Sequence, residues 1–189
     1  MRYLILCVCI SFLFSCNNRK KQDPFDAYMK SLLEHVGKLE EQTQEAFIDD
    51  QLVFYGSDSL KTAFLSSLPL ENILFFYFSE QTCIPCINQT IEVISEYFPD
   101  YIHDENIIFI SPDFPSRLRD DCYGKKLLTF YLGTIGLSIE NSNVPFFFTV
   151  NKEMEISSIH IVIKEEMERT ASFLKLFADS HIRPTTSLR

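Results

Sequence analysis

Short apolar runs alternate with helically spaced apolar residues along most of this chain of 189 residues. Continuous or alternating apolar runs predict strands, whereas apolar positions three or four residues apart predict amphipathic helices. By these criteria we expect strands at residues 51–55, 72–79, 106–111, 145–150 and 155–163. We expect helices at residues 24–46, 59–67, 86–98, within 116–132, and at 164–180.

From residue 72 onwards the predicted order is β-α-β-α-β-β-α. The first two connections are long enough for parallel crossovers, and the third is a hairpin through residues 151–154. This order predicts an α/β domain over residues 49–181, with a central mixed sheet and helices on both faces. The amphipathic extension helix would occupy the segment 24–48, with an apolar stripe that packs on the domain or, alternatively, binds a partner. Residues 182–189 would form a flexible tail.

The first sixteen residues resemble the signal sequence of a bacterial lipoprotein. Arg2 precedes an apolar run from Leu4 to Phe14, which is too short to span a hydrocarbon core of roughly 30 Å. The sequence Leu-Phe-Ser-Cys at residues 13–16 resembles a lipobox. The resemblance implies that residues 1–15 are removed, that Cys16 is lipidated and that residues 16–23 carry the lipid and a polar spacer. A plain secretory signal with an incidental Cys16 is the alternative.

Composition and charge narrow the possible classes of function. Hydrophobic residues make up 46% of the chain and include 18 Phe, enough for a sizeable core. The net charge of −9 excludes a nucleic-acid-binding domain, which needs a basic surface. A lipid anchor implies an extracytoplasmic protein held at a bacterial membrane. The lack of acidic residues directly after Cys16 favours a location that faces the periplasm.

The cysteine pair Cys83-Ile84-Pro85-Cys86 carries the candidate chemistry. It follows a buried strand and opens a helix, where unpaired N–H groups favour a thiolate, and Pro85 is tolerated in the first turn. We expect Cys83 to be the nucleophile and Cys86 the resolving thiol. A structural bridge is the alternative, although a loop this short stabilises by only roughly 2 kcal/mol.

The other cysteines and the histidines give weaker evidence for a functional site. Cys7 and Cys9 leave with the signal, and Cys122 is a buried cysteine or a third redox partner. A metal site would need ligands besides the cysteine pair. His35, His103 and His160 show no matching spacing, so no metal site is expected.

The element order, with C-x-x-C at the start of the first core helix, resembles the thioredoxin fold. In that superfamily a cis-proline begins the third core strand opposite the cysteines, and Pro145, preceded by Val144, matches this position. The resemblance implies a cis bond there and a substrate groove beside Val144 and Pro145. The common motif is W-C-G-P-C, from which this chain departs at two positions, Thr82 and Ile84. Tyr77 stands where thioredoxins carry a buried acidic residue.

The resemblance implies a thiol–disulfide oxidoreductase without an organic cofactor. Its partners would be protein thiols or disulfides and a membrane or periplasmic electron donor. The uncharged Ile84-Pro85 pair favours a reductase, because strong oxidants need an unusually stabilised thiolate. The alternatives are a non-enzymatic lipoprotein that uses the fold as a binding module, and a variant that binds copper or zinc.

Overall fold

The computed structural model describes residues 23–55, 61–70, 72–112, 122–125, 127–130 and 132–182. The predicted signal sequence, the predicted lipidation site Cys16 and the residues after 182 lie outside these residues. No helix in the described ranges is both long and apolar enough to cross a membrane.

The predicted N-terminal helix is present as α2, Pro24–Thr43. Asp23 caps its start, because its carboxylate accepts a hydrogen bond of 3.0 Å from the backbone N–H of Phe25. The helix ends three residues earlier than predicted, and Glu45 has a left-handed backbone with φ of 66°. The chain divides into two compact units between His35 and Val36, within this helix.

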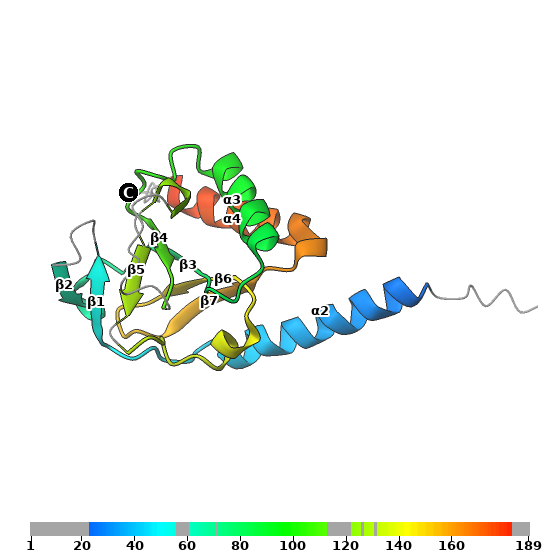
Figure 1. Cartoon of the computed structure of the whole chain (residues 1–189), viewed down its shortest axis with the longest axis horizontal. Helices are drawn as coiled ribbons and strands as arrows, with labels where there is room; N and C mark the ends of the chain where they lie inside the picture. The colour runs from blue at the N-terminus through cyan, green and yellow to red at the C-terminus, as the bar shows by residue number, and fades with distance from the viewer. Residues whose placement is uncertain are drawn as a thin grey trace, which may run out of the picture. The chain divides into compact units, whose positions relative to one another are not determined.

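The second unit contains a seven-stranded mixed sheet with the strand order β2-β1-β5-β4-β3-β6-β7. The neighbours β3, β4 and β5 run parallel, and all other pairs are antiparallel (Figure 1). The strands are β1 Leu52–Tyr55, β2 Lys61–Phe64, β3 Leu74–Tyr77, β4 Ile107–Ile110, β5 Leu127–Phe130, β6 Phe146–Val150 and β7 Ile156–Ile161. The helices are α3 Ile84–Tyr97 and α4 Met167–Ile182, with short 3-10 helices η1 Leu65–Ser67, η2 Cys122–Gly124, η3 Ser138–Ser142 and η4 Lys164–Glu166.

The predicted thioredoxin-like α/β fold is confirmed by this topology. The crossover β3-α3-β4 joins two parallel neighbours, and the hairpin β6-β7 followed by α4 lies on the other side of β3. The strand β3 is therefore central, as its unbroken run of apolar residues predicts, and all four of its residues are buried.

Two helix predictions were wrong. Residues 61–64 form β2 rather than part of a helix, and only Leu65–Ser67 turn helically. In the segment 116–132, Leu127–Phe130 form β5, a fully buried strand parallel to β4. Periodicity cannot separate a buried strand from a helix in a run of four apolar residues, and pairing with β4 decides the outcome. Residues 116–121, the start of that segment, lie outside the described residues.

Aromatic side chains from β3 and β6 fill both faces of the sheet. On the face covered by α3 and α4, the ring of Phe76 lies 4.7 Å from that of Phe147. On the opposite face Phe75 stacks on Phe148 at 4.9 Å and Tyr77 on Phe146 at 4.5 Å. The helix η3 lies on this second face, where Glu140 accepts a hydrogen bond from the Tyr77 hydroxyl. Helices thus cover the two faces, as predicted.

The edge strand β7 is covered by the chain that follows α2. The N–H of Ile156 donates to the carbonyl of Ala46 at 2.8 Å, and the N–H of Ile48 donates to the carbonyl of Met154 at 3.0 Å. Further along, the N–H of Ile161 donates to the Glu40 carboxylate at 2.6 Å. These bonds satisfy backbone groups that an open edge would leave to solvent or to another chain.

Glu40 also links β7 to α4. Its carboxylate forms an ion pair with Arg169 and lies 3.8 Å from Nδ1 of His160. His160 is buried, its Nε2 lies 3.0 Å from the Thr170 hydroxyl, and its ring stacks on Phe173 at 4.7 Å. Burial, assisted by the positive charge of Arg169, lowers the pKa of His160 to about 3.

We expect His160 to make the protein less stable in acid. An unfolded His has a pKa of about 6.5, so below that value the unfolded chain binds one more proton than the folded chain, and stability falls as the pH falls towards about 3. Urea unfolding of the wild type and His160→Gln at several pH values between 4 and 7 measures this. Gln retains a hydrogen-bonding group for Thr170 but cannot titrate, so the variant should lose part of the pH slope. Equal slopes in both proteins would contradict the assignment.

Candidate redox site

The segment between β3 and α3 is a tight, hydrogen-bonded turn that delivers Cys83 to the start of the helix. The Thr82 hydroxyl, buried under the turn, accepts a bond of 2.9 Å from the N–H of Ser79. The N–H of Thr82 donates in return to the Ser79 carbonyl at 3.1 Å. The polar Thr82, which replaces the Trp of the common motif, thus holds the turn in place through its hydroxyl.

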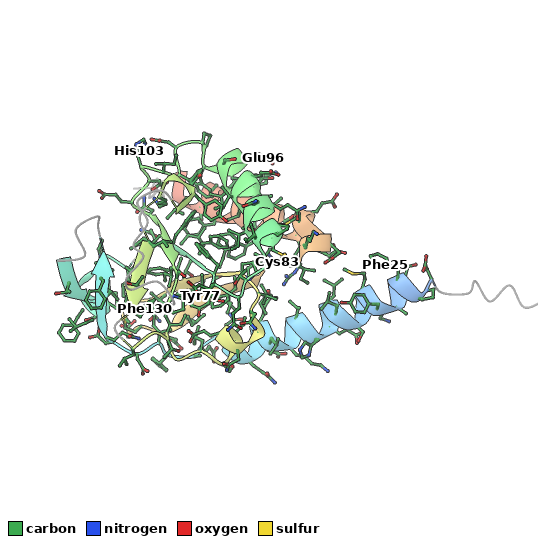
Figure 2. The ribbon with its side chains drawn as sticks, in the orientation of Figure 1. Phe25, Tyr77, Cys83, Glu96, His103 and Phe130 are labelled. Carbon is green, nitrogen blue, oxygen red and sulfur yellow. The ribbon has the colours of Figure 1, made fainter. Side chains whose placement is uncertain are left out.

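Cys83 is the N-cap residue of α3, as the sequence predicts. Its carbonyl accepts the first helical bond, of 3.1 Å, from the N–H of Ile87. Pro85 lies in the first turn, where a missing N–H costs no hydrogen bond. Cys83 is exposed, and the neighbouring side chain of Ile84 is 66% exposed, although it is apolar. Figure 2 shows Cys83 at the beginning of α3.

The two thiols are free, and their pKa values are shifted in opposite directions. Hydrogen bonds from the thiol and then the backbone N–H of Cys86 lower the pKa of Cys83. Burial, followed by the bond to Cys83, raises the pKa of Cys86 to about 11. Cys86 is half-buried, one turn into α3. The pair therefore consists of an exposed thiol that ionises readily and a covered thiol that retains its proton, as nucleophile and resolving thiol require.

Strand register brings Val144 and Pro145 to the same end of the sheet as Cys83. Tyr77, the last residue of β3, pairs with Phe146, the first residue of β6. Pro145 is therefore next to the end of β3 from which the turn to Cys83 departs. It is buried, and its carbonyl accepts a bond of 3.0 Å from the N–H of Val162. Val144 is half-buried beside it.

The prediction of a cis bond before Pro145 was wrong, because the described residues contain no cis peptide. Asn143, which ends η3, adopts a left-handed backbone with φ of 55°. The bond before Pro145 has the trans form, which is the form that X–Pro bonds favour by about 0.5–1 kcal/mol.

Two charged residues that sequence reasoning missed lie near the cysteines. The positive charge of Lys164 acts to lower the pKa of both Cys83 and Cys86, and the negative charge of Glu165 acts to raise them. Both residues belong to η4, directly after β7. The signal that could have found them is their position after a strand that pairs with the residues following Pro145.

Tyr77, in the place of an acidic residue, does not point to an open site. It is buried, and its hydroxyl donates a bond of 3.0 Å to Glu140. The Glu140 carboxylate also accepts bonds from the Thr134 hydroxyl and the N–H groups of Ile135 and Leu137. Glu140 thus organises the loop that leads to Pro145. Glu80, an acidic residue close to the cysteines in sequence, is exposed in the turn before Cys83.

The remaining candidate residues do not join the pair. His160 is enclosed by its own partners, and His103, beyond the far end of α3 in Figure 2, pairs with Asp100. Across the described residues, no group of three or more His, Cys, Asp or Glu side chains could hold a metal ion. The backbone of Cys122 is in η2, and its side chain lies outside the described part.

The chain's sequence matches no family profile and no curated protein. Among solved structures it is similar to an uncharacterized thioredoxin-like protein from Porphyromonas gingivalis. That match is 17% identical, with a TM-score of 0.48, and covers 73% of this chain and 95% of that one. A peroxiredoxin-like protein from Aquifex aeolicus is 11% identical over 71% of this chain and 86% of its own, with a TM-score of 0.43. These similarities are too low to carry a statement about function.

We expect removal of the Cys86 thiol to raise the pKa of Cys83. Cys86→Ala abolishes the side-chain hydrogen bond that contributes most to stabilising the Cys83 thiolate, whereas Cys86→Ser keeps an O–H donor there. The rate of alkylation by iodoacetamide, measured against pH and mapped to Cys83 by mass spectrometry, reports its thiolate fraction. The midpoint should rise more in Cys86→Ala than in Cys86→Ser. An unchanged midpoint in Cys86→Ala would show that Cys86 does not activate Cys83.

Proposed function

We propose that this protein is a thiol–disulfide oxidoreductase that uses Cys83 and Cys86 as its redox pair. The observation that carries the proposal is the asymmetry of the two thiols. Cys83 is exposed with a lowered pKa, while Cys86 is half-buried with a pKa of about 11. A structural bridge requires no difference in pKa or exposure between its two cysteines. Stepwise exchange, by contrast, requires one thiol to attack the substrate first and the other to react only after the mixed disulfide has formed.

The reaction would proceed in two steps. The Cys83 thiolate attacks one sulfur of a substrate disulfide, a mixed disulfide forms, and the second substrate sulfur leaves as a thiolate. Cys86 then loses its proton and attacks the Cys83 sulfur. The substrate sulfurs gain the two electrons that the cysteine pair loses. They take up two protons, one released by Cys86 and one from water, which received the Cys83 proton when that thiol ionised. The products are a substrate dithiol and a Cys83–Cys86 disulfide, which a donor dithiol must reduce before the next cycle.

The turn before β6 would receive the substrate. Val144 and Pro145 lie at the end of the sheet where β3 delivers Cys83, and an extended segment could pair with the backbone there. Ile84, exposed beside Cys83, offers an apolar surface of the kind that binds an apolar substrate side chain.

We propose that the protein acts as a reductase. Ile84 and Pro85, between the cysteines, supply neither a charge nor an imidazole, and Lys164 and Glu165 act on Cys83 in opposite directions. A thiolate stabilised chiefly by its neighbour Cys86 and the helix terminus is not the kind that makes a strong oxidant.

We also propose that the protein works outside the cytoplasm, anchored by a lipid on Cys16 and facing the periplasm. Support comes from the lipobox-like residues 13–16 and the apolar run before them. In this location a membrane or periplasmic electron donor would re-reduce Cys83–Cys86, and protein disulfides would be the substrates.

We expect a reversible Cys83–Cys86 disulfide with a potential between about −120 and −280 mV, towards the negative end for a reductase. The full chain in detergent, equilibrated with thiol–disulfide buffers, alkylated and mapped by mass spectrometry, gives this value. Cys86→Ser should accumulate mixed disulfides with substrates, and Cys83→Ser should form none. A potential well below about −300 mV would mean a structural bridge, and no disulfide at all would end the redox proposal.

We expect Ile84→Ser to weaken the reaction with protein disulfides through KM, by several-fold, because an apolar contact beside Cys83 is lost. The rate with a small disulfide such as hydroxyethyl disulfide should stay within about twofold of the wild-type rate, since small reagents do not need the contact. Leu176→Ser is the matched control. It removes another exposed apolar side chain, located beside Asn72 and Val150 at the opposite end of the sheet. Equal effects of the two variants would argue against a docking role for Ile84.

A further inference from the structure

The segment that joins β7 to α4 lies at the redox end of the sheet. Ile161, the last residue of β7, pairs with Phe146, which in turn pairs with Tyr77 at the end of β3. The N–H of Val162 then donates to the Pro145 carbonyl at 3.0 Å. Three neighbouring strands therefore place the turn to Cys83, the turn at Pro145 and the start of η4 side by side.

The helix packing continues this arrangement. Residues Ile87 and Ile94 of α3 and Leu174 of α4 belong to one buried cluster, so the two helices are held against each other. The 3-10 helix η4 directly precedes α4, and Cys83 directly precedes α3. Ile163 is buried, whereas Lys164 and Glu165 after it are exposed. The buried residue anchors the turn, and the two charged side chains remain in the solvent around the cysteine pair.

We propose that η4 sets the electrostatic potential at the redox pair, with Lys164 stabilising the Cys83 thiolate and Glu165 opposing it. The strand register that places η4 at the same end of the sheet as Cys83 carries this assignment. In agreement with it, the positive charge of Lys164 acts to lower the pKa of Cys83 and the negative charge of Glu165 acts to raise it. Lys164 and Glu165 act on Cys83 through their charges alone, and neither side chain exchanges electrons. A substitution at Lys164 or Glu165 would change the reactivity of the Cys83 thiolate slightly. The cysteines and the residues between them would stay the same.

The size of the effect that Lys164 and Glu165 have on the Cys83 thiolate depends on how far the three side chains are exposed to water. Cys83 and both charged side chains are exposed to water, where the interaction between two unit charges is weak, so each charge should have only a small effect on Cys83. The shift should also shrink in 1 M salt, where the Debye length is about 3 Å. An effect that acts through altered packing would not respond to salt in this way.

The test is the pH dependence of Cys83 alkylation by iodoacetamide, an uncharged reagent, in the full chain. Lys164→Gln should raise the midpoint by about 0.2–0.5 pH units, and Glu165→Gln should lower it by a similar amount. The double variant should return close to the wild type. Lys164→Arg keeps the charge and should leave the midpoint unchanged. Lys175→Gln, which removes an exposed lysine from the body of α4, controls for net charge.

Shifts of opposite sign that diminish in 1 M salt would support the proposal. Shifts of the same sign, no shift, or an equal shift in Lys175→Gln would overturn it. The inference deepens the proposed function, but its readout needs no disulfide substrate. A chain with these shifts and no reversible Cys83–Cys86 disulfide would retain the electrostatic assignment and lose the proposed enzyme activity.

Discussion

The pairing of β3 with β6 is the constraint on which the rest of this structure depends. In this register Phe76 stacks on Phe147 on one face and Phe75 stacks on Phe148 on the other, so large rings are buried on both sides of the sheet. A slip by one residue would exchange the two faces. The same register places Tyr77 directly opposite Phe146. It therefore brings the turn after β3, which leads to Cys83, next to the turn before β6, which contains Pro145.

Much of the fold follows from the sequence because its strongest signals are local. The apolar run at residues 72–79, the cysteine motif after it and the stripe from Ile87 to Ile94 each identify an element without reference to distant partners. The strands β2 and β5 could not be predicted in this way. Each is a four-residue segment whose conformation depends on a neighbour, β1 for β2 and β4 for β5. Tertiary pairing overrides weak local preference in such short segments.

The residues of the candidate site also divide into those that the local sequence identifies and those that only tertiary pairing identifies. Cys83, Cys86 and Pro145 carry recognisable patterns, and the positions of all three follow from the element order. Lys164 carries no pattern, since its relevance arises only from the pairing of β7 with β6. The trans bond before Pro145 was also not predicted, because the sequence shows the position of the proline and not the conformation of its peptide bond.

The cover on β7 has a consequence for where an autonomous folding unit can begin. Glu40 and Ala46 accept hydrogen bonds from N–H groups on the outer side of this strand, and Ile48 donates to the carbonyl of Met154 just before it. A chain shortened to start at residue 49 would keep all the described strands and both cysteines of the redox pair. It would nevertheless expose an unpaired strand edge, which invites the same edge of another molecule and leads to intermolecular sheet growth. The residues at the end of α2 and directly after it therefore protect this edge of the sheet from self-association.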